Sequence, residues 1–429
     1  MRVRSQVVEL WIASVCALLL LACTGDGDDP VPTATASAST SASPDDPASV
    51  VASIRGDATG VTATEIKIGS YYPKTGPSAI HDHIEKGWTL YFDEVNRKGG
   101  IAGRKVRFLV EDDAYNPSLT ASVVKKLVEQ DQVFMLFNGL GTPTSLATLG
   151  YLEQQGVPSL FIASGATRWT TAGPGFLGLQ PDFVSEGKAL GEFIARHHGG
   201  SKYGIIFQND DMGKSGRDGI KAAVGSNLAL VGEESYEAGS ADITSQAMKL
   251  INSGADVIGV YAMATQLAGM LKNVRAQGRS VTFFASSISA QSTTARLADG
   301  AMDGVFTAGY VPDPTEAATN PGVQRVVDFL RAHGVAQPTT NHIYGWMAAE
   351  HLERLLAATG RNLNRTSILY ALENLAFPGD WQCTVCYAPT IVTSDDRRPI
   401  EVMFIQRWDE SQKAFVRVGD LINTETTRE

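Results

Sequence analysis

The stretch YGIIFQNDDMGKSGRDGIKAAVGSNLALVGEESY, residues 203–236, decides the fold class of this chain. An apolar run at 203–208 is followed by a helical pattern at 213–224 and by a second strand pattern at 228–236. The helix is long enough to carry the chain back across a sheet, so the two strands are expected to pair in parallel. This unit predicts an α/β protein built on parallel sheets.

The same alternation continues on both sides of this unit. The further strand patterns lie at 65–70, 105–110, 133–137, 158–162, 257–261 and 281–285, and the helical patterns at 81–98, 118–130, about 145–155, 244–252 and 266–277. Because the rhythm restarts after Pro181, we expect two doubly wound parallel-sheet lobes joined by a hinge, with ligands at the carboxyl ends of the strands. Lobe one is assigned to residues 61–180 and about 310–365, and lobe two to residues 181–309 and about 366–429.

The N-terminus reads as a targeting segment. Arg2 and Arg4 precede a short apolar run, and Leu20-Leu21-Ala22-Cys23 resembles the bacterial lipobox, in which the Cys is lipidated. Residues 1–22 are therefore expected to be a lipoprotein signal peptide, although an ordinary signal peptide or an uncleaved anchor would also contain such a run. Residues 23–60 are poor in apolar groups and are expected to form a disordered tether behind the lipidated Cys23. This arrangement predicts an extracytoplasmic protein held at the membrane by its lipid alone.

Charge and cysteine usage exclude several classes of partner. The chain has 36 Lys and Arg against 46 Asp and Glu, without a basic stripe, so nucleic acid is not an expected partner. Cys383 and Cys386 are spaced C-x-x-C, which outside the cytoplasm favours a disulfide over a zinc site that would need two more ligands. His81-Asp82-His83 offers two imidazoles but no third ligand nearby, which favours a polar surface turn. We therefore expect no metal and no cofactor.

Enzyme motifs are incomplete in this sequence. Gly213-Lys214-Ser215 resembles the end of a phosphate-binding loop, but Gln208 stands where the upstream glycine is required. Gly139-Leu140-Gly141 lacks the third glycine of a dinucleotide fingerprint, because Thr144 occupies that place. The sequence therefore predicts a binding protein and not an enzyme.

Six blocks in order carry a resemblance to a known family. They are IKIGSYYPKTGPSA (66–79), FDEVNRKGGIAGRKV (92–106), EDDAYNPSLT (111–120), FNGLGTPTSLA (137–147), GVPSLFIASGAT (156–167) and FQNDDMGKSGRDGI (207–220). From residue 65 to about 310 the chain resembles the type I periplasmic binding proteins of the branched-chain amino acid family, which includes the leucine-binding protein. The resemblance implies two lobes linked by three chain crossings, with a cleft that closes on a solute.

The resemblance places the first wall of the ligand site after the strands of lobe one. The residues implied are Gly141, Thr142, Thr144, Ser145, Ala163, Ser164, Gly165, Ala166 and Thr167. Hydroxyls and backbone N–H groups at a helix N-terminus form an anion site, since the helix dipole favours negative charge there. Thr144 or Ser145 would also serve as a simple helix cap.

Lobe two departs from the family pattern. Family members that bind amino acids often carry a Tyr where this chain has Met212, and a carboxylate in the block around Ser287. No acid lies between Gly278 and Leu297, and a buried ammonium without a counter-charge is costly, so a small carboxylate-bearing solute without an amine is favoured. Asp210 or Asp211 remains a possible replacement for that acid. The other residues expected at the cleft are Tyr72, Asp211, Tyr261 and Met263.

Together these observations predict an extracytoplasmic solute-binding lipoprotein that works as a monomer. Its expected partners are a small organic acid or amino-acid-like solute and the permease subunits of an ABC importer. The alternative function is a ligand-sensing receptor of the same fold that feeds a signalling partner.

Overall fold

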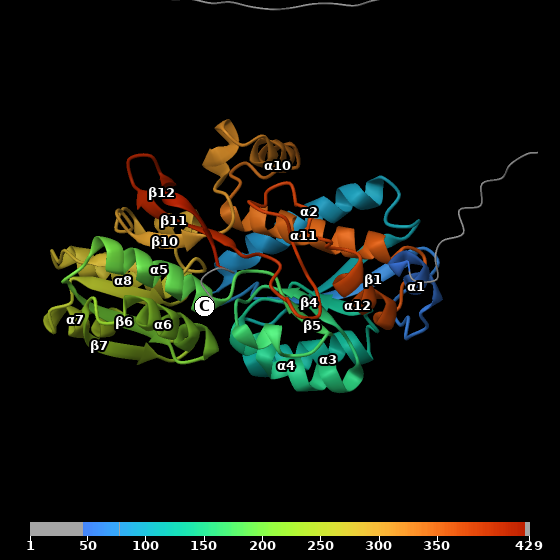
Figure 1. Ribbon diagram of the computed structural model, residues 1–429, viewed down its shortest axis with the longest axis horizontal. Coiled ribbons are helices and arrows are strands. Elements are labelled where there is room, and N and C mark those ends of the chain that lie inside the picture. The colour runs from blue at the N-terminus through green and yellow to red at the C-terminus, as the bar shows by residue number, and fades with distance from the viewer. Residues whose placement is uncertain (1–45, 77, 425–429) are drawn as a thin grey trace, which may run out of the picture. The chain divides into compact units, whose positions relative to one another are not determined.

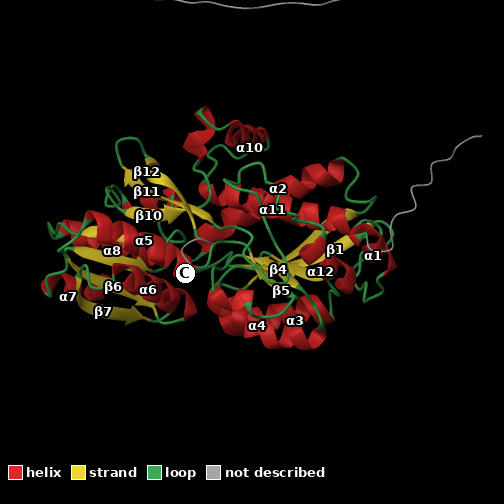
Figure 2. Ribbon diagram, in the orientation of Figure 1, coloured by secondary structure: helices red, strands yellow, loops and turns green. Residues whose placement is uncertain are grey.

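The computed structural model describes residues 46–76 and 78–424 of the chain, and its helices and strands are shown in Figures 1 and 2. Two sheets organise this part of the molecule. The first has the order β2-β1-β3-β4-β5 and is parallel throughout. Its strands are β1 (Glu65–Tyr72), β2 (Lys105–Asp112), β3 (Met135–Phe137), β4 (Ser159–Ile162) and β5 (Phe176–Gly178). β3 and β4 are wholly buried, as expected of strands covered on both faces.

Helices cover both faces of this first sheet. On one face lie α3 (Pro117–Glu129) and α4 (Thr142–Gln155), whose side chains Val124, Leu127 and Leu152 share a core with β1 and β3. On the other face lie α2 (Asp82–Arg97), α10 (Pro321–Ala332), α11 (Thr340–Thr359) and α12 (Arg365–Asn374). Figure 1 shows α3 and α4 below the strands and α2 and α11 above them.

The second sheet has the order β12-β11-β10-β9-β8-β6-β7. Five strands pair in parallel: β6 (Lys202–Gln208), β7 (Ala229–Tyr236), β8 (Val257–Tyr261), β9 (Thr282–Ala285) and β10 (Phe306–Gly309). α5 (Phe183–His197) and α6 (Asp211–Val224) pack on one face, and α7 (Thr244–Asn252), α8 (Ala264–Ala276) and α9 (Ser292–Ala298) on the other. The expected α/β fold with two strand–helix lobes is confirmed.

The edge of the second sheet differs from the expected parallel pattern. β11 (Val402–Asp409) and β12 (Ala414–Asn423) form a hairpin that adds to β10 in antiparallel fashion. A short turn at residues 410–413 joins them, so no crossover helix is available to make the pair parallel.

The chain returns to the second sheet only at β11, later than the expected boundary near residue 366. Ile368, Leu372, Cys383, Val392 and Ile400 all belong to the core of the first sheet. Residues 366–400 therefore pack with lobe one, and only the β11–β12 hairpin belongs to the second sheet, which corrects the boundary placed near residue 366. Cys383 and Cys386 are joined by a disulfide within this segment, as their spacing predicts.

Order also begins earlier than expected. A helix, α1 (Pro47–Ser53), lies inside the segment that composition assigns to a tether. Val51 is buried in the core of lobe one, and the Asn362 side-chain amide donates hydrogen bonds to the carbonyls of Val51 and Ile54. A few aliphatic side chains are sufficient to order this helix because lobe one provides the apolar surface that covers them. Residues 1–45, with the expected signal peptide and Cys23, lie outside the described residues.

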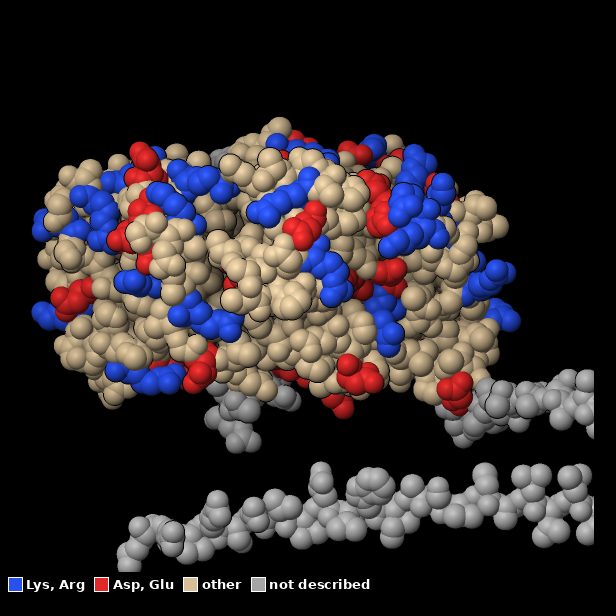
Figure 3. Space-filling model, turned by 90° about the horizontal axis from the view of Figure 1, so that it is seen from above, with Lys and Arg blue, Asp and Glu red and all other residues tan. Residues whose placement is uncertain are grey.

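The described surface carries mixed charge. Figure 3 shows Lys and Arg interspersed with Asp and Glu over one face, without a broad field of one sign. Among the described helices, none is long and apolar enough to cross a membrane. In the same part of the chain, no group of three or more His, Cys, Asp or Glu side chains is placed to hold a metal ion.

Candidate functional site

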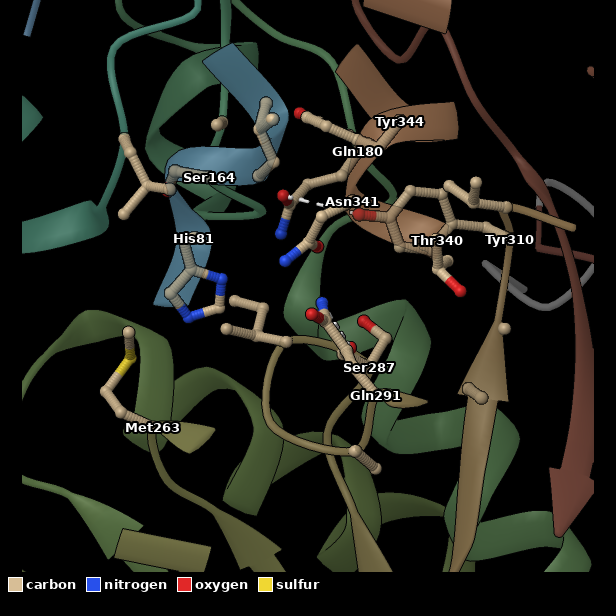
Figure 4. Close-up of a pocket in the computed structure, with 18 of the residues that line it drawn as sticks. His81, Ser164, Gln180, Met263, Ser287, Gln291, Tyr310, Thr340, Asn341 and Tyr344 are labelled. Atoms are coloured by element: carbon tan, nitrogen blue, oxygen red, sulfur yellow. Dashed lines mark hydrogen bonds between the residues drawn. The ribbon is translucent and has the colours of Figure 1, made fainter. Parts of the chain in front are cut away.

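A pocket lies at the carboxyl ends of strands from both sheets and contains roughly 770 Å³ of empty space, part of it open to solvent. Residues that line it are His81, Ile84, Tyr115, Leu140, Gly141, Thr142, Ala163, Ser164, Gln180, Met212, Met263, Ser287, Ile288, Ala290, Gln291, Ala308, Gly309, Tyr310, Val311, Thr340, Asn341, Tyr344, Gln406 and Phe415. None of these lining residues is an Asp, Glu, Lys or Arg. Figure 4 shows many of their side chains directed into a shared space.

The first wall is the N-terminus of α4. Gly141 is the N-cap residue, with a φ of 107°, and no side chain caps the helix. A Cβ at this position would lie 2.5 Å from the Tyr115 ring and 2.6 Å from Thr144 Oγ1, so glycine is required for both its φ and its size. The first N–H groups of a helix lack partners within it, so those at the start of α4 are available to an anion in the pocket.

Thr142 and Ser164 bring hydroxyls to the same wall. Their oxygen atoms lie 2.7 Å apart, which joins the start of α4 to the loop after β4. Ser164 Oγ also accepts a hydrogen bond from the Ala166 N–H at 3.2 Å. Gly141, Thr142, Ala163 and Ser164 therefore lie at the pocket, as the sequence pattern suggests.

Five other residues predicted in this wall do not line the pocket. Thr144 donates its hydroxyl to the Leu140 carbonyl, and Ser145 accepts a hydrogen bond from the Tyr71 hydroxyl at 2.7 Å. α4 begins three residues earlier than expected, which turns both side chains into the protein. Gly165, Ala166 and Thr167 lie beyond the pocket, where the Gly165 carbonyl accepts from the Phe183 N–H at 2.8 Å.

Tyr72 is also placed behind the pocket. It is fully buried, and its hydroxyl donates to the Oδ1 atom of Asn138. Tyr344 of α11 lines the pocket instead, as does Tyr310 after β10. The Tyr310 hydroxyl lies 3.5 Å from Gln180 Oε1, which links the first and second chain crossings between the lobes (Figure 4).

The second wall comes from lobe two. Met212 begins α6, Met263 precedes α8, and Ser287 and Gln291 follow β9, so three of the residues predicted here lie at the pocket. Tyr261 is buried beneath this wall, and Asp211 is exposed on the first turn of α6. Asp210 caps α6, since it accepts from the Gly213 N–H at 3.0 Å and from the Gln208 side chain at 2.6 Å. Neither Asp210 nor Asp211 lines the pocket.

Glu186 of α5 is hydrogen-bonded to Ser287 of this wall. Its Oε1 accepts from the Ser287 N–H at 2.9 Å, and its Oε2 accepts from the Ser287 hydroxyl at 2.7 Å. Burial raises the pKa of Glu186 to about 7, although the two bonds from Ser287 act to lower it. The sequence does hold a signal: Glu186 lies at helical spacing with the apolar residues Phe183 and Leu190, where an apolar side chain is normally found.

His81 was missed as a pocket residue and corrects one expectation. It is 2% exposed and lines the pocket, so it is not part of a polar surface turn. Its Nε2 atom is buried without a hydrogen-bond partner, and burial lowers the pKa of the imidazole to about 4. The neutral ring is directed into the pocket (Figure 4).

α11 supplies three more residues that sequence reasoning missed. Thr340, Asn341 and Tyr344 come from its first turns and line the pocket. Asn341 Nδ2 and the Tyr344 hydroxyl are buried without partners. Because buried polar atoms are normally hydrogen-bonded, these atoms mark places where a solute or water is expected. No sequence block of the resemblance reaches α11.

Comparisons with known proteins agree with this geometry. Residues 65–413 match the family model described as periplasmic binding protein. The chain belongs to the periplasmic binding protein family. Among curated relatives, Leu/Ile/Val-binding protein homolog 8 of Brucella suis is 24% identical over 385 residues, covering 85% of this chain and 93% of that protein. The matched proteins are solute-binding proteins, in agreement with the prediction that the chain is not an enzyme.

Solved structures share the fold while differing in solute. A branched chain amino acid ABC transporter protein from Thermus thermophilus with bound valine aligns with a TM-score of 0.75 at 17% identity, covering 86% of this chain and all of that one. A fatty acid ABC transporter substrate-binding protein from Thermomonospora curvata aligns with the same score at 21% identity, covering 86% and 95%. At these identities the likeness establishes the fold alone.

Proposed function

We propose that the mature protein is an extracytoplasmic solute-binding protein of an ABC importer, which holds a small organic acid or amino-acid-like solute between its lobes. The observation that carries this proposal is the pocket itself. It contains groups from both sheets, lies at the carboxyl ends of their strands, and has buried polar atoms without partners on both walls. A solute that bonds both walls would favour a closed arrangement of the lobes.

The first wall supports a carboxylate as the bound group. An uncapped helix N-terminus faces the pocket together with the Thr142 and Ser164 hydroxyls. One of these hydroxyls donates to the other, so the helix N–H groups and the remaining hydroxyl proton are the donors available to an anion. Valine and fatty acids, the solutes named for two proteins of the same fold, both carry a carboxylate. We therefore assign carboxylate binding to Gly141, Thr142, Ala163 and Ser164. The opposite wall is formed by Met212, Met263 and Ser287.

A thermal-shift screen tests this function directly. The mature chain is heated with amino acids, aliphatic acids and aromatic acids, each added well above the concentration needed to saturate it. A ligand at 100 times its dissociation constant adds about 2.7 kcal/mol to stability and raises the melting temperature measurably. A shift with carboxylates, absent for the matching amides or alcohols, supports the proposal. If no acid produces a shift, a carboxylate solute is excluded.

Anchoring through Cys23 is the second part of the proposal. The lipobox-like residues 20–23 and the family's extracytoplasmic location support removal of residues 1–22 and lipidation of Cys23. In cells fed an alkyne fatty acid, the wild-type chain is expected in the membrane fraction and to take up the label. C23A should lose both properties while its solute affinity stays unchanged. Retention of the label by C23A would contradict this assignment.

A further inference from the structure

The loop after β9 has an unusual hydrogen-bonding arrangement. Ser287 donates both of its hydrogen bonds, from the backbone N–H and from the hydroxyl, to the carboxylate of Glu186. Its Oγ atom therefore has only lone pairs left to offer the pocket, which Ser287 lines. A serine in this state accepts hydrogen bonds and does not donate them.

Gln291 adds a second acceptor to the same wall. Its Nε2 donates to the Ser287 carbonyl at 3.3 Å, which fixes the orientation of the amide because the reverse orientation would place two oxygen atoms together. Its Oε1 atom is buried without a partner. Figure 4 shows Ser287 and Gln291 side by side, both directed into the pocket.

Glu186 is a buried carboxylate that accepts both donors of Ser287, and the Tyr261 hydroxyl is a further side-chain partner that lowers its pKa. It is 1% exposed, and in the described part of the chain no Lys or Arg forms an ion pair with it. Arg398 pairs instead with Asp182, the N-cap residue of the same helix, at 3.1 Å. Buried acids normally have a cationic partner, so this one leaves negative potential on the wall formed by Ser287.

From these contacts we propose that Glu186 fixes the hydrogen-bond polarity of the lobe-two wall, so that the pocket selects solutes with a hydrogen-bond donor at the end opposite the carboxylate group. This inference rests on the proposed function and names the solute class more closely. Glu186 is a positioning residue, because it acts through Ser287 and does not line the pocket. A hydroxyl, an amide N–H or an ammonium group would each satisfy Ser287 Oγ and Gln291 Oε1.

Matched acids that differ at one atom provide the test. Isothermal titration compares acids that carry an amino group, a hydroxyl group or no donor at the end opposite the carboxylate, on the same aliphatic and aromatic skeletons, using the mature chain in detergent. We expect acids with a donor to bind at least tenfold more tightly than the unsubstituted acids. If the unsubstituted acids bind equally well, the inference is wrong although the proposed function stands. If no acid binds, the proposed function fails and the inference fails with it.

The three forms of the acid also identify the donor. Tighter binding of the acids with a terminal amino group would show that the solute ammonium pairs electrostatically with Glu186. Tighter binding of the acids with a terminal hydroxyl group would show that a neutral donor is preferred. Either result supports an acceptor wall.

Glu350 provides a matched control for Glu186. It is a half-buried glutamate of α11 that accepts from the backbone N–H and the hydroxyl of Thr384 at 2.7 and 2.6 Å, yet it does not line the pocket. E186Q and S287A should each reduce the donor preference at least tenfold, whereas E350Q should leave it within twofold. Persistence of the preference in both E186Q and S287A would overturn the inference even if one variant were poorly folded.

A pH profile separates positioning from a merely structural role. The charged and titratable groups that face Glu186 are Asp182 of the same helix, Tyr261 of β8 and Tyr310 after β10. Because the ionised carboxylate is the form that accepts both Ser287 donors, affinity for donor acids should rise roughly five- to tenfold from pH 6 to pH 8. The same rise should be absent in E186Q, and a rise that survives in E186Q would contradict the assignment.

Discussion

The two walls of the pocket have opposite hydrogen-bond character. In lobe one, the start of α4 and one of the two paired hydroxyls of Thr142 and Ser164 offer donors, and the supporting side chains Thr144 and Ser145 are tied into the protein. In lobe two, Ser287 and Gln291 offer acceptors, since Glu186 consumes the donors of Ser287. The difference teaches that the residues behind a wall decide what the wall recognises.

The largest expected effect on solute affinity comes from a side chain added to the lobe-one wall, which offers the hydrogen-bond donors. In G141A, a Cβ would be forced against the Tyr115 ring at 2.5 Å in a backbone conformation that disfavours side chains. We expect solute affinity to fall about 100-fold or more, which corresponds to about 2.7 kcal/mol. Titration with the best acid from the screen measures this loss.

Gly150, in the same helix, is the control for that variant. A Cβ there meets nothing within 4 Å, so G150A should leave affinity unchanged. Its stability should rise by about 0.5–1 kcal/mol, because alanine is the better helix former. An equal loss of affinity in both variants would show that the Gly141 effect is not local to the wall.

The next effect concerns Glu186, behind the lobe-two wall that offers hydrogen-bond acceptors. It is measured as the pH dependence of the free energy of unfolding. Burial raises the pKa of Glu186 from 4.5 to about 7, so the folded state holds its proton more tightly than the unfolded state does. The contribution of this group is therefore most favourable below pH 4.5 and is lost as pH rises through 7. E186Q does not ionise, so between pH 5 and pH 8 it should gain about 2 kcal/mol relative to wild type.

Urea unfolding of the two ligand-free proteins at both pH values measures this gain. The groups facing Glu186 that would modify it are Asp182, Tyr261 and Tyr310. A constant difference between the two proteins across the range would mean that Glu186 is already ionised in the folded state at pH 5.

A smaller effect is expected at Asn341, which adds a buried donor from α11. Its Nδ2 has no partner, so N341L removes an unsatisfied group from the ligand-free protein and a bonding group from the complex. We expect about tenfold weaker solute binding with an equal or higher melting temperature. N374A, at an exposed position in α12, should change neither quantity. Unchanged affinity in N341L would remove Asn341 from the donor groups.

The smallest effect is expected at Asp211. This side chain is exposed at the start of α6 and does not line the pocket. D211N should therefore change solute affinity by less than twofold, even for amino acids. A tenfold loss restricted to amine-bearing solutes would reassign the amine-recognising acid from Glu186 to Asp211.

Periodicity allowed most of the fold to be predicted. The bounds of α7 and β8 agree with the patterns at 244–252 and 257–261, because a repeat of apolar residues reports directly on burial. The segment 366–400 was misplaced since much of it forms no regular helix or strand, and its packing is decided by distant partners. α1 was missed for a related reason: Val51 is buried only because lobe one covers it.

The pocket was predicted only where strand ends define it. Gly141, Thr142, Ala163, Ser164, Met212, Met263 and Ser287 follow strands or begin the next helix, and topology brings such positions together. Glu186 acts on Ser287 across 101 positions of sequence, and Asn341 belongs to a helix that returns from the far end of the chain. A search for an acid close to Ser287 in sequence was therefore bound to miss the one close to it in space.

The packing of α1 determines which lobe would bear a force transmitted from the membrane anchor. Val51 and the Asn362 contacts join this helix, the first described element of the chain, to lobe one. With Cys23 lipidated as proposed, any pull from the membrane reaches lobe one first. Lobe two, which holds the Glu186 wall, is then the lobe that moves relative to the membrane. Opening the pocket therefore does not stretch the tether.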